Sequence, residues 1–297
     1  MLPADSVAIY AHRTAPSGQP ARVIAGPHTQ LRFPSAVAVD ASGAAFVANR
    51  AANSVTVYAA SASGDASPTR TIAGPRAQLS LPTGVAVDGR GYVFVTNRSA
   101  NAVTVYARGA SGDVRPLRTI AGTRTELRAP TSIALDAAGE MFVACRDSNA
   151  VVVFAPGASG DAAPVRIIAG SRTALRSPYG IAVGAGGMTY VVNALADGSS
   201  SVTVYASRAD GDAAPLRALA GRRTGMDSAS GVAVDPRGMA FVSDHGDRTK
   251  VGKVLVFAAG SSGDAEPLRT FAGRALPAPF GIGLGPAGEI FVVNHRE

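Results

Sequence analysis

The sequence predicts an all-β fold in which a unit of four short strands recurs six times. Runs of alternating and β-branched residues are separated by turns rich in Gly, Pro and Asp, as expected for many short strands. The spacing between equivalent turns is regular, and a period of about 40–50 residues with four strands per repeat indicates a six-bladed β-propeller. The equivalent turn positions are Asp40, Asp88, Asp136, Gly184, Asp235 and Gly285, which gives spacings of 48, 48, 48, 51 and 50 residues.

The second unit shows the four strands most clearly, at residues 82–88, 91–97, 103–107 and 118–122. Its first strand alternates bulky Val85 and Val87 with small Ala86, and the other units repeat this pattern. Side chains alternate across a strand, so one face of each innermost strand carries the bulky residues and the other carries the small ones. We interpret these positions as core, with the bulky face filling the gap to a neighbouring blade.

The two ends of the sequence each carry half of a unit. Residues 6–10 and 22–26 match a third and a fourth strand, whereas residues 281–284 and 290–294 match a first and a second strand. We therefore expect the N-terminal strands (6–25) to pair with the C-terminal strands (279–294). This pairing completes the sixth blade and makes residues 1–297 one closed domain, leaving no open sheet edge between first and last blade.

Composition gives a weaker signal about function. The chain has 28 Lys and Arg against 21 Asp and Glu, a net charge of +7, which favours anionic partners. Surface arginines also keep proteins soluble, and an Arg-rich composition can follow genome base composition. The single cysteine, Cys145, excludes an internal disulfide. No apolar run is long enough to suggest a membrane span.

Strand connectivity predicts an uneven distribution of charge. We call top the face that carries the loops from strand two to strand three and from strand four to the next blade; the other face is the bottom. The predicted bottom turns repeat Asp-x-x-Gly and Ser-Gly-Asp, which we interpret as turn chemistry rather than calcium sites. The interblade loops hold mainly arginines, and the loops from strand three to strand four hold mainly acids, so we expect a positive top face. The arginines are Arg32, Arg76, Arg124, Arg128, Arg172, Arg176, Arg222, Arg223 and Arg274, and the acids are Asp65, Asp113, Asp161, Asp210, Asp212, Asp264 and Glu266.

Six further arginines fall on the fourth strand of each blade. Charged residues on an edge strand oppose sheet-to-sheet aggregation, and we prefer this explanation to a binding role. These residues are Arg22, Arg70, Arg118, Arg166, Arg217 and Arg269.

The repeat resembles the NHL repeat over essentially the whole chain. The resemblance is carried by Pro-x-Gly-Val-Ala-Val-Asp (82–88), Val-Phe-Val-Thr-Asn (93–97) and Asn-x-Val-x-Val-Tyr (101–106), while the absence of Trp argues against a WD40 propeller. The segment Ser-Gly-Asp-x-x-Pro-x-Arg-Thr-Ile-Ala-Gly (111–122) is similar to bacterial NHL-type propellers, many of them exported. The resemblance implies a six-bladed propeller, a fold that hosts binding scaffolds, streptogramin B lyases and lactonases of the SMP-30 type.

A candidate site lies at the top mouth of the central channel, where strand one begins and strand two ends. The residues after the repeat's Pro are small hydroxyl residues in four units, but Tyr179 and Phe280 in the fourth and sixth. Strand two ends in Asn followed by Arg50 or Arg98, with Cys145-Arg146 in the third unit. The next units depart from this pattern with Asn193-Ala194, Asp244-His245 and Asn294-His295, and the loops after Asn193 and Asp244 are longer. Insertions in a repeat often map to the binding face.

Two kinds of site are compatible with these departures. Tyr179, Phe280, Asn193, Asn294, Arg50, Arg98 and Arg146 are candidate ligand-binding residues. His245, His295 and Asp244 are candidates for acid–base catalysis or for a divalent metal, because imidazole serves either purpose near neutral pH. Streptogramin lyases, which share the fold, use histidines at the top of the propeller, so the resemblance favours a catalytic role for His245 and His295. The histidine–glutamate pattern of those lyases is absent from this sequence. Drift in loop residues also accounts for the two histidines.

The combined hypothesis is a non-catalytic binding or scaffold propeller without a cofactor, presenting a basic top face to a small anionic ligand or a protein partner. The alternatives are a lyase or lactonase that uses the channel mouth, and a protein that binds single-stranded nucleic acid on the basic face. We expect a monomer. Residues 1–7 contain no signal peptide, so the expectation is a secreted or periplasmic protein whose leader is absent from this chain, or a cytoplasmic one.

Overall fold

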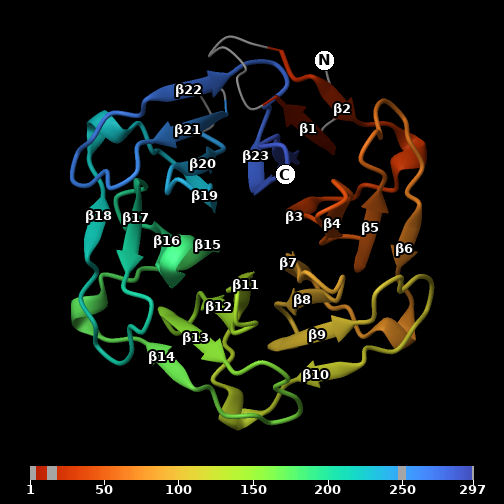
Figure 1. Cartoon of the computed structure of the whole chain (residues 1–297), viewed down its shortest axis with the longest axis horizontal. Helices are drawn as coiled ribbons and strands as arrows, with labels where there is room; N and C mark the ends of the chain where they lie inside the picture. Colours follow the sequence, from red (N-terminus) through yellow and green to blue (C-terminus); the bar gives the residue numbers. More distant parts are fainter. Residues whose placement is uncertain (1–4, 12–18, 247–251, 296–297) are drawn as a thin grey trace.

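Six four-stranded antiparallel sheets are arranged around a central channel (Figure 1). The structure is a computed structural model that describes residues 5–11, 19–246 and 252–295. Blade 1 consists of β3 (Pro34–Val39), β4 (Ala45–Asn49), β5 (Ser54–Tyr58) and β6 (Arg70–Ile72); blade 2 of β7 (Pro82–Val87), β8 (Val93–Asn97), β9 (Ala102–Tyr106) and β10 (Arg118–Ile120); blade 3 of β11 (Pro130–Leu135), β12 (Met141–Cys145), β13 (Ala150–Phe154) and β14 (Arg166–Ile168); blade 4 of β15 (Pro178–Val183), β16 (Thr189–Ala194), β17 (Ser200–Tyr205) and β18 (Arg217–Leu219); blade 5 of β19 (Ala229–Val234), β20 (Ala240–Asp244), β21 (Lys253–Phe257) and β22 (Arg269–Ala272).

The sixth blade is built from both ends of the chain, as predicted. Its strand order is β2-β1-β24-β23, combining β1 (Ser6–Tyr10) and β2 (Arg22–Ile24) with β23 (Pro279–Leu284) and β24 (Ile290–Asn294). The joining pair is antiparallel and runs from Ser6 opposite Asn294 to Tyr10 opposite Ile290. The predicted all-β, six-bladed fold and its closure by residues 6–25 and 279–294 are therefore confirmed.

The alternation in the first strands places side chains between blades. Val85 and Val87 of β7 pack with Phe46 and Ala48 of blade 1, while Ala86 packs on the other side, in a cluster with blade 3. The bulky face thus fills the gap to the preceding blade and the small face allows the following blade to approach. No helix among the described residues is long and apolar enough to cross a membrane.

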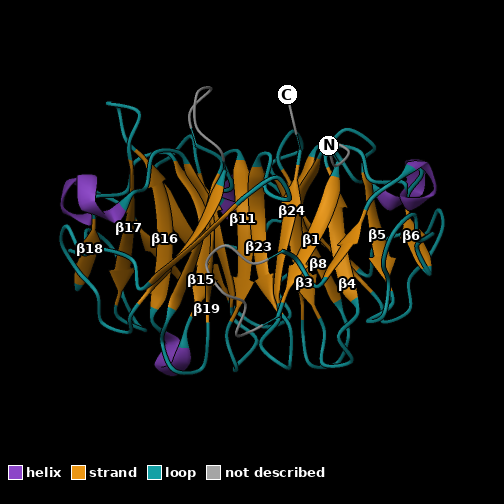
Figure 2. Ribbon diagram, turned by 90° about the horizontal axis from the view of Figure 1, so that it is seen from above, coloured by secondary structure: helices purple, strands orange, loops and turns teal. Residues whose placement is uncertain are grey.

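Short 3₁₀ helices mark the connections between blades on the outer rim, toward the top face (Figure 2). They are η1 (Pro27–Thr29), η2 (Pro75–Ala77), η3 (Thr123–Thr125), η4 (Ser171–Thr173) and η6 (Arg222–Thr224), whereas η5 (Ala185–Gly187) lies on the opposite face, in a loop from strand one to strand two. β24, the second strand of blade 6, ends on the same face as the other second strands. This face is the top as defined from the sequence.

The two kinds of predicted turn have different roles. In the Asp-x-x-Gly turns, Asp88 Oδ1 accepts hydrogen bonds from the backbone N–H groups of Arg90 and Tyr92, and Gly91 has a φ of 84°, as turn chemistry requires. The aspartates of the Ser-Gly-Asp turns instead reach into the preceding interblade loop. Asp113 Oδ1 accepts from Arg76 N at 2.7 Å, and Gly112 pairs with Ile72 of blade 1.

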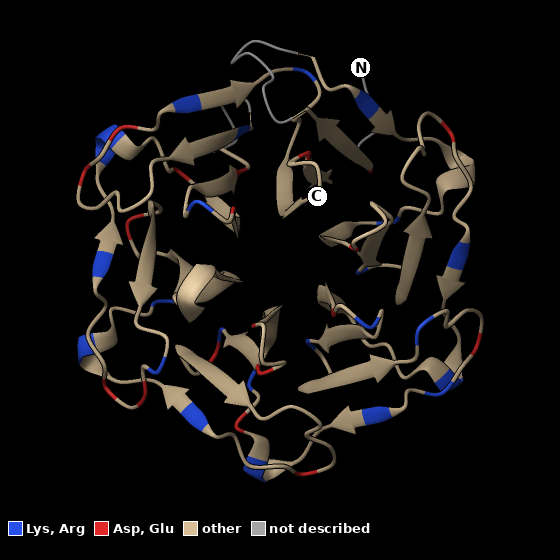
Figure 3. Cartoon of the chain, viewed as in Figure 1, with Lys and Arg blue, Asp and Glu red and all other residues tan. Residues whose placement is uncertain are grey.

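This second contact corrects the expected separation of charge. Each described Ser-Gly-Asp loop holds a 3₁₀ connection that was assigned to the other face, so acids and arginines meet on the rim. Arg76 forms an ion pair with Asp113 at 3.3 Å, and Arg223 forms one with Glu266 at 3.1 Å. Figure 3 shows blue and red segments side by side at the corners of the ring. The prediction of acidic loops on one face and basic loops on the other is wrong for these residues.

The arginines of the fourth strands also have internal partners. Arg118 donates to the carbonyl of Ala158 in the next blade, and Arg166 forms a half-buried ion pair with Glu140 at 2.5 Å. The guanidinium of Arg70 lies 5.6 Å from the ring of Phe46. These residues hold neighbouring segments of the rim together, a role beyond the predicted protection of a strand edge.

Candidate functional site

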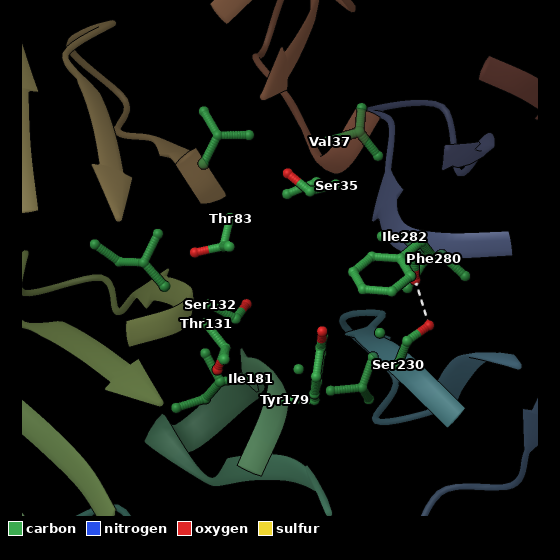
Figure 4. A pocket seen from close by; sticks show the side chains of 17 residues that line it. Ser35, Val37, Thr83, Thr131, Ser132, Tyr179, Ile181, Ser230, Phe280 and Ile282 are labelled. Atoms are coloured by element: carbon green, nitrogen blue, oxygen red, sulfur yellow. Dashed lines mark hydrogen bonds between the residues drawn. The ribbon is translucent and has the colours of Figure 1, made fainter. Parts of the chain in front are cut away.

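The channel is lined by the first residues of the six innermost strands. Figure 4 shows Ser35, Thr83, Thr131, Tyr179, Ser230 and Phe280 around one cavity, as the sequence placed them. The cavity contains about 470 Å³ of empty space, including space open to solvent. The repeat's Pro starts most of these strands, so the next residue is the first with a side chain that reaches the channel. We call this end of the channel the mouth.

The hydroxyl groups at these positions connect each blade to the next. Ser35 Oγ donates to the carbonyl of Pro82 at 2.9 Å, Thr83 Oγ1 to that of Pro130 at 2.8 Å, and Thr131 Oγ1 to that of Pro178 at 3.0 Å. In blade 5, Ser230 Oγ donates to the carbonyl of Phe280 at 2.9 Å, the dashed line in Figure 4. We call these bonds the hydroxyl seam. These bonds satisfy buried polar atoms, so the hydroxyl groups serve to hold neighbouring blades together.

Tyr179 and Phe280 interrupt the hydroxyl seam. Their rings meet across Ser230 of the blade between them, with centroids 5.3 Å apart and planes at 82°. In blade 6 a histidine completes the connection instead: His295 Nδ1 lies 2.9 Å from the carbonyl oxygen of Pro34 in blade 1. Because a carbonyl only accepts, Nδ1 carries the proton in this bond.

The rings at the mouth form a continuous group. His295 stacks on Phe33 with centroids 4.1 Å apart and lies 4.6 Å from Phe280. His245, an exposed residue, lies 6.4 Å from Phe280 on the adjacent blade. We call Phe33, Tyr179, His245, Phe280 and His295 the aromatic arc. It spans blades 4 to 6 and the connection into blade 1.

Three arginines follow the second strands of blades 1 to 3 and complete the mouth. Arg50, Arg98 and Arg146, the basic arc, are half-buried. Arg50 lies over the ring of Phe33 at 5.7 Å and Arg146 over that of Tyr179 at 5.8 Å, so the two arcs meet in a cation–π contact at each end. None of the three makes an ion pair with a carboxylate in the described part of the chain.

The asparagines that end the second strands lie behind the mouth. Asn193 is fully buried; its Oδ1 accepts from Arg176 N at 3.1 Å and its Nδ2 donates to Val191 O and Thr203 Oγ1. Asn294 is also buried, and its Nδ2 donates to Ser6 Oγ and Ala275 O. Both side chains tie strands two and three to an interblade loop. Direct ligand binding by Asn193 and Asn294 stays a prediction.

Asp244 occupies the same position in blade 5 and has a similar role. The carboxylate is fully buried and accepts hydrogen bonds from the backbone N–H groups of Asp227, Ser228 and Gly246. Asp244, His245 and His295 are not gathered into one ligand set, and no group of three His, Cys, Asp or Glu side chains within the described ranges could hold a metal ion. Residues 247–251 of the long loop after Asp244 lie outside the described residues.

One member of the mouth, Phe33, is an aromatic residue of the top face in the sequence but not one of the predicted site residues. Phe33 stands where the next three units have Leu81, Ala129 and Ser177, and all four residues have positive φ, between 40° and 55°. This backbone turns the side chain toward the mouth. The signal was a single aromatic residue in a repeat position otherwise filled by small or aliphatic residues.

Comparisons with known proteins agree on a β-propeller. A sequence model of the family described as lactonase, seven-bladed β-propeller, matches residues 69–166, about a third of the chain. No curated protein sequence matches the chain. The structure is similar to Kuenenia stuttgartiensis hydrazine synthase, with a TM-score of 0.59, 16% identity, and coverage of 88% of this chain and 73% of that chain.

Two further solved structures are propellers with named activities. A catalytically inactive virginiamycin B lyase from Staphylococcus aureus, solved with quinupristin, matches with a TM-score of 0.56 and 11% identity over 98% of this chain and 96% of that chain. A putative 6-phosphogluconolactonase from Bacteroides uniformis matches with a TM-score of 0.54 and 14% identity over 86% and 77%. At these identities the likeness concerns the fold. The chain is a six-bladed propeller similar in architecture to lactonase and lyase propellers.

Proposed function

We propose that this chain is a non-catalytic binding module of the NHL type, whose ligand occupies the channel mouth between the aromatic and basic arcs. One observation supports this most strongly. The hydroxyl groups that the repeats share at the mouth are used between blades, whereas Tyr179 and Phe280, which break the repeat, are half-exposed rings. Opposite them, the three arginines of the basic arc make no ion pair with a carboxylate among the described residues. A concave site with apolar walls and a few polar groups is the general form of a ligand site.

Part of the positive charge expected on the top face is paired with acids. In the outer loops, Arg76 pairs with Asp113 and Arg223 with Glu266. At the mouth itself the positive charge is that of Arg50, Arg98 and Arg146. This arrangement favours a small anionic ligand, or one anionic group of a protein partner, over an extended nucleic-acid strand.

Catalysis is the second candidate. The lactonase match over residues 69–166 and the exposed imidazole of His245 beside Phe280 favour it. His245 is then the general base, since Asp244 is buried against three N–H groups and His295 Nδ1 bonds Pro34. Turnover in a panel of simple and macrocyclic lactones that is lost in His245→Ala, with wild-type stability, supports this candidate. No turnover excludes it for that panel.

Binding at the mouth is tested with a variant that restores the repeat. Phe33→Leu, Tyr179→Thr and Phe280→Ser introduce the residues that other blades carry at Leu81, Thr83 and Ser35, so we expect the triple variant to fold. The matched control is Leu216→Ser, which removes an exposed apolar side chain on the outer rim. We call the triple variant the restored mouth.

The measurement combines affinity with position. Fluorotyrosine labelling gives seven fluorine NMR signals, one per Tyr, and Tyr179→Thr identifies the mouth signal. Aromatic carboxylates, oligonucleotides and lactones are added in turn. We expect a binding probe to shift the Tyr179 signal and to lose affinity in the restored mouth, but not in Leu216→Ser. Probes that bind the restored mouth unchanged would contradict the proposal, and affinity for oligonucleotides that falls steeply with salt would favour the nucleic-acid alternative.

A further inference from the structure

The arcs also indicate which chemical class of ligand fits the mouth. We infer that the site takes a flat aromatic ligand carrying one negatively charged group, such as an aromatic carboxylate. This inference rests on the proposed function, because it assumes that the mouth is the binding site. Three features support it: the geometry of the rings, the arginines that have no carboxylate partner in the described part of the chain, and the channel hydroxyls that already bond neighbouring blades.

The rings provide a surface for a flat ligand. From Phe33 through His295 and Phe280 to Tyr179, successive centroids are 4.1, 4.6 and 5.3 Å apart. Aromatic pairs attract at centroid separations of about 4.5–7 Å, in stacked or edge-to-face arrangements, so one more ring extends such a group favourably. Phe33, Tyr179 and Phe280 are half-exposed, which leaves ring surface available to a ligand.

The arginines determine the charge of the ligand. A half-buried guanidinium elsewhere, that of Arg166, has a carboxylate partner in Glu140 at 2.5 Å. Among the described residues, Arg50 and Arg146 lie over ring faces, at 5.7 and 5.8 Å, and have no carboxylate partner. The carboxylate of Asp244, next to His245 of the aromatic arc, is buried against backbone N–H groups. A ring surface alone also attracts cations, but here the protein's own arginines occupy that role. A carboxylate on the ligand gains charge-assisted hydrogen bonds with either one.

The channel below the rings offers a ligand few polar groups to bind. Ser35, Thr83 and Thr131 donate to neighbouring carbonyls, and Tyr179 and Phe280 meet over Ser230. A ligand rich in hydroxyl groups, such as a sugar, finds few open donors or acceptors there. Recognition therefore depends on ring contact at the aromatic arc and on one charge at the basic arc.

The test compares probes that differ in one property. 2-Naphthoate is flat and anionic, 2-naphthalenemethanol is flat and neutral, 2-naphthylmethylammonium is flat and cationic, and cyclohexanecarboxylate is anionic but not flat. We expect 2-naphthoate to bind about tenfold more tightly than any of the other three, because only this probe uses both arcs. Titration calorimetry or ligand-observed NMR measures each dissociation constant.

Variants separate the two contributions. Arg50→Gln and Arg146→Gln should each weaken 2-naphthoate binding several-fold and leave the neutral probe unchanged, whereas Arg90→Gln, an exposed turn arginine away from the mouth, should change neither. Equal affinity for the neutral or cationic probe, or no binding of 2-naphthoate at millimolar concentration, would overturn the ligand class. If other probes still bind and lose affinity in the restored mouth, the proposed function stands without this inference; if none does, both fail.

Discussion

Blades 1 to 3 and blades 4 to 6 share a frame but present different chemistry at the mouth. In the first half, Ser35, Thr83 and Thr131 close the hydroxyl seam and Arg50, Arg98 and Arg146 follow the second strands. In the second half, rings replace two of the hydroxyls, and no arginine follows a second strand. A propeller can therefore change the residues that line its channel in single blades, and in blade 6 another group, His295, takes over the connection to the next blade.

His295 is the clearest example of such a replacement. Phe280 has no hydroxyl to donate to blade 1, and His295 Nδ1 reaches the carbonyl of Pro34 from the end of the second strand. The imidazole then stacks between Phe33 and Phe280. The ring that satisfies the carbonyl is also part of the aromatic arc, so stability and the proposed binding surface depend on the same side chain.

The largest expected effect tests the frame that both halves share. Burial raises the pKa of Tyr10, Tyr58, Tyr106 and Tyr205 from 10.0 to about 12, and the hydroxyls of Tyr58 and Tyr205 donate to carbonyls of η1 and η4. A folded-state pKa above the unfolded value means that stability is complete below pH 10 and is lost as the pH rises toward 12. We expect the free energy of unfolding to fall by about 1–2 kcal/mol per tyrosine over this pH range.

Two measurements check the alkaline prediction. Phenolate absorbance should show these tyrosines ionising near pH 12, and urea unfolding between pH 9 and 12 should show stability falling over the same interval. Tyr58→Phe is the control, since Phe154 and Phe257 occupy this position in blades 3 and 5. Stability that is constant up to pH 12 would show that the blades do not depend on these hydroxyls.

The second prediction compares equivalent positions in the two halves. Asp244→Ala leaves three N–H groups of blade 5 without an acceptor and should cost about 3–4 kcal/mol. Asn97→Ala in blade 2 removes one accepted bond, from Ser80 N, and two donated bonds, and should cost about 2–3 kcal/mol. Urea denaturation measures both. Asp244→Ala with wild-type stability would contradict the structural role of this carboxylate and favour a catalytic one.

The fold and the position of the mouth could be predicted because both follow from repetition. Equivalent turn positions recur every 48 to 51 residues, so the phase of every strand can be read without knowing a single contact. The contacts of Asp113 and His295 could not be read in this way. Each joins residues that are distant in the sequence, Arg76 in the preceding interblade loop and Pro34 at the other end of the chain. Packing of neighbouring blades brings the first pair together, and closure of the ring brings the second.

Charge was predicted less well than fold for the same reason. Connectivity assigns loops to faces, but it does not show how far a loop extends. The Ser-Gly-Asp loops extend along the rim to the preceding interblade connection, where Asp161 accepts from Arg124 N and Asp212 from Arg172 N. A loop can thus extend beyond the face to which its connectivity assigns it. Here the interblade connection offers a backbone N–H group to the aspartate and a Gly that leaves room for its side chain.

A third prediction tests how each half closes its connection to the next blade. Thr131→Val removes the bonds to Ala144 O and Pro178 O and should cost about 1–2 kcal/mol, because buried carbonyls lose their donor. His295→Phe should cost a similar amount, since it keeps a ring against Phe33 but removes the donor to Pro34. His295→Asn restores a donor without the ring and should recover part of the loss. Wild-type stability in His295→Phe would mean that ring stacking, rather than the hydrogen bond to Pro34, connects blade 6 to blade 1.

The smallest expected change is in Tyr179→Thr, which makes blade 4 resemble blades 2 and 3. The new hydroxyl can donate to the carbonyl of Ala229, the residue aligned with the Pro of other blades, and gains about 1 kcal/mol. Loss of the edge-to-face contact with Phe280 costs about as much, about 0.5–1.5 kcal/mol, so the net change in unfolding free energy should lie near zero. A variant of unchanged stability that no longer binds a mouth ligand would show that Tyr179 serves binding rather than folding. A loss of more than about 2 kcal/mol would show instead that the two halves differ because blade 4 needs its ring.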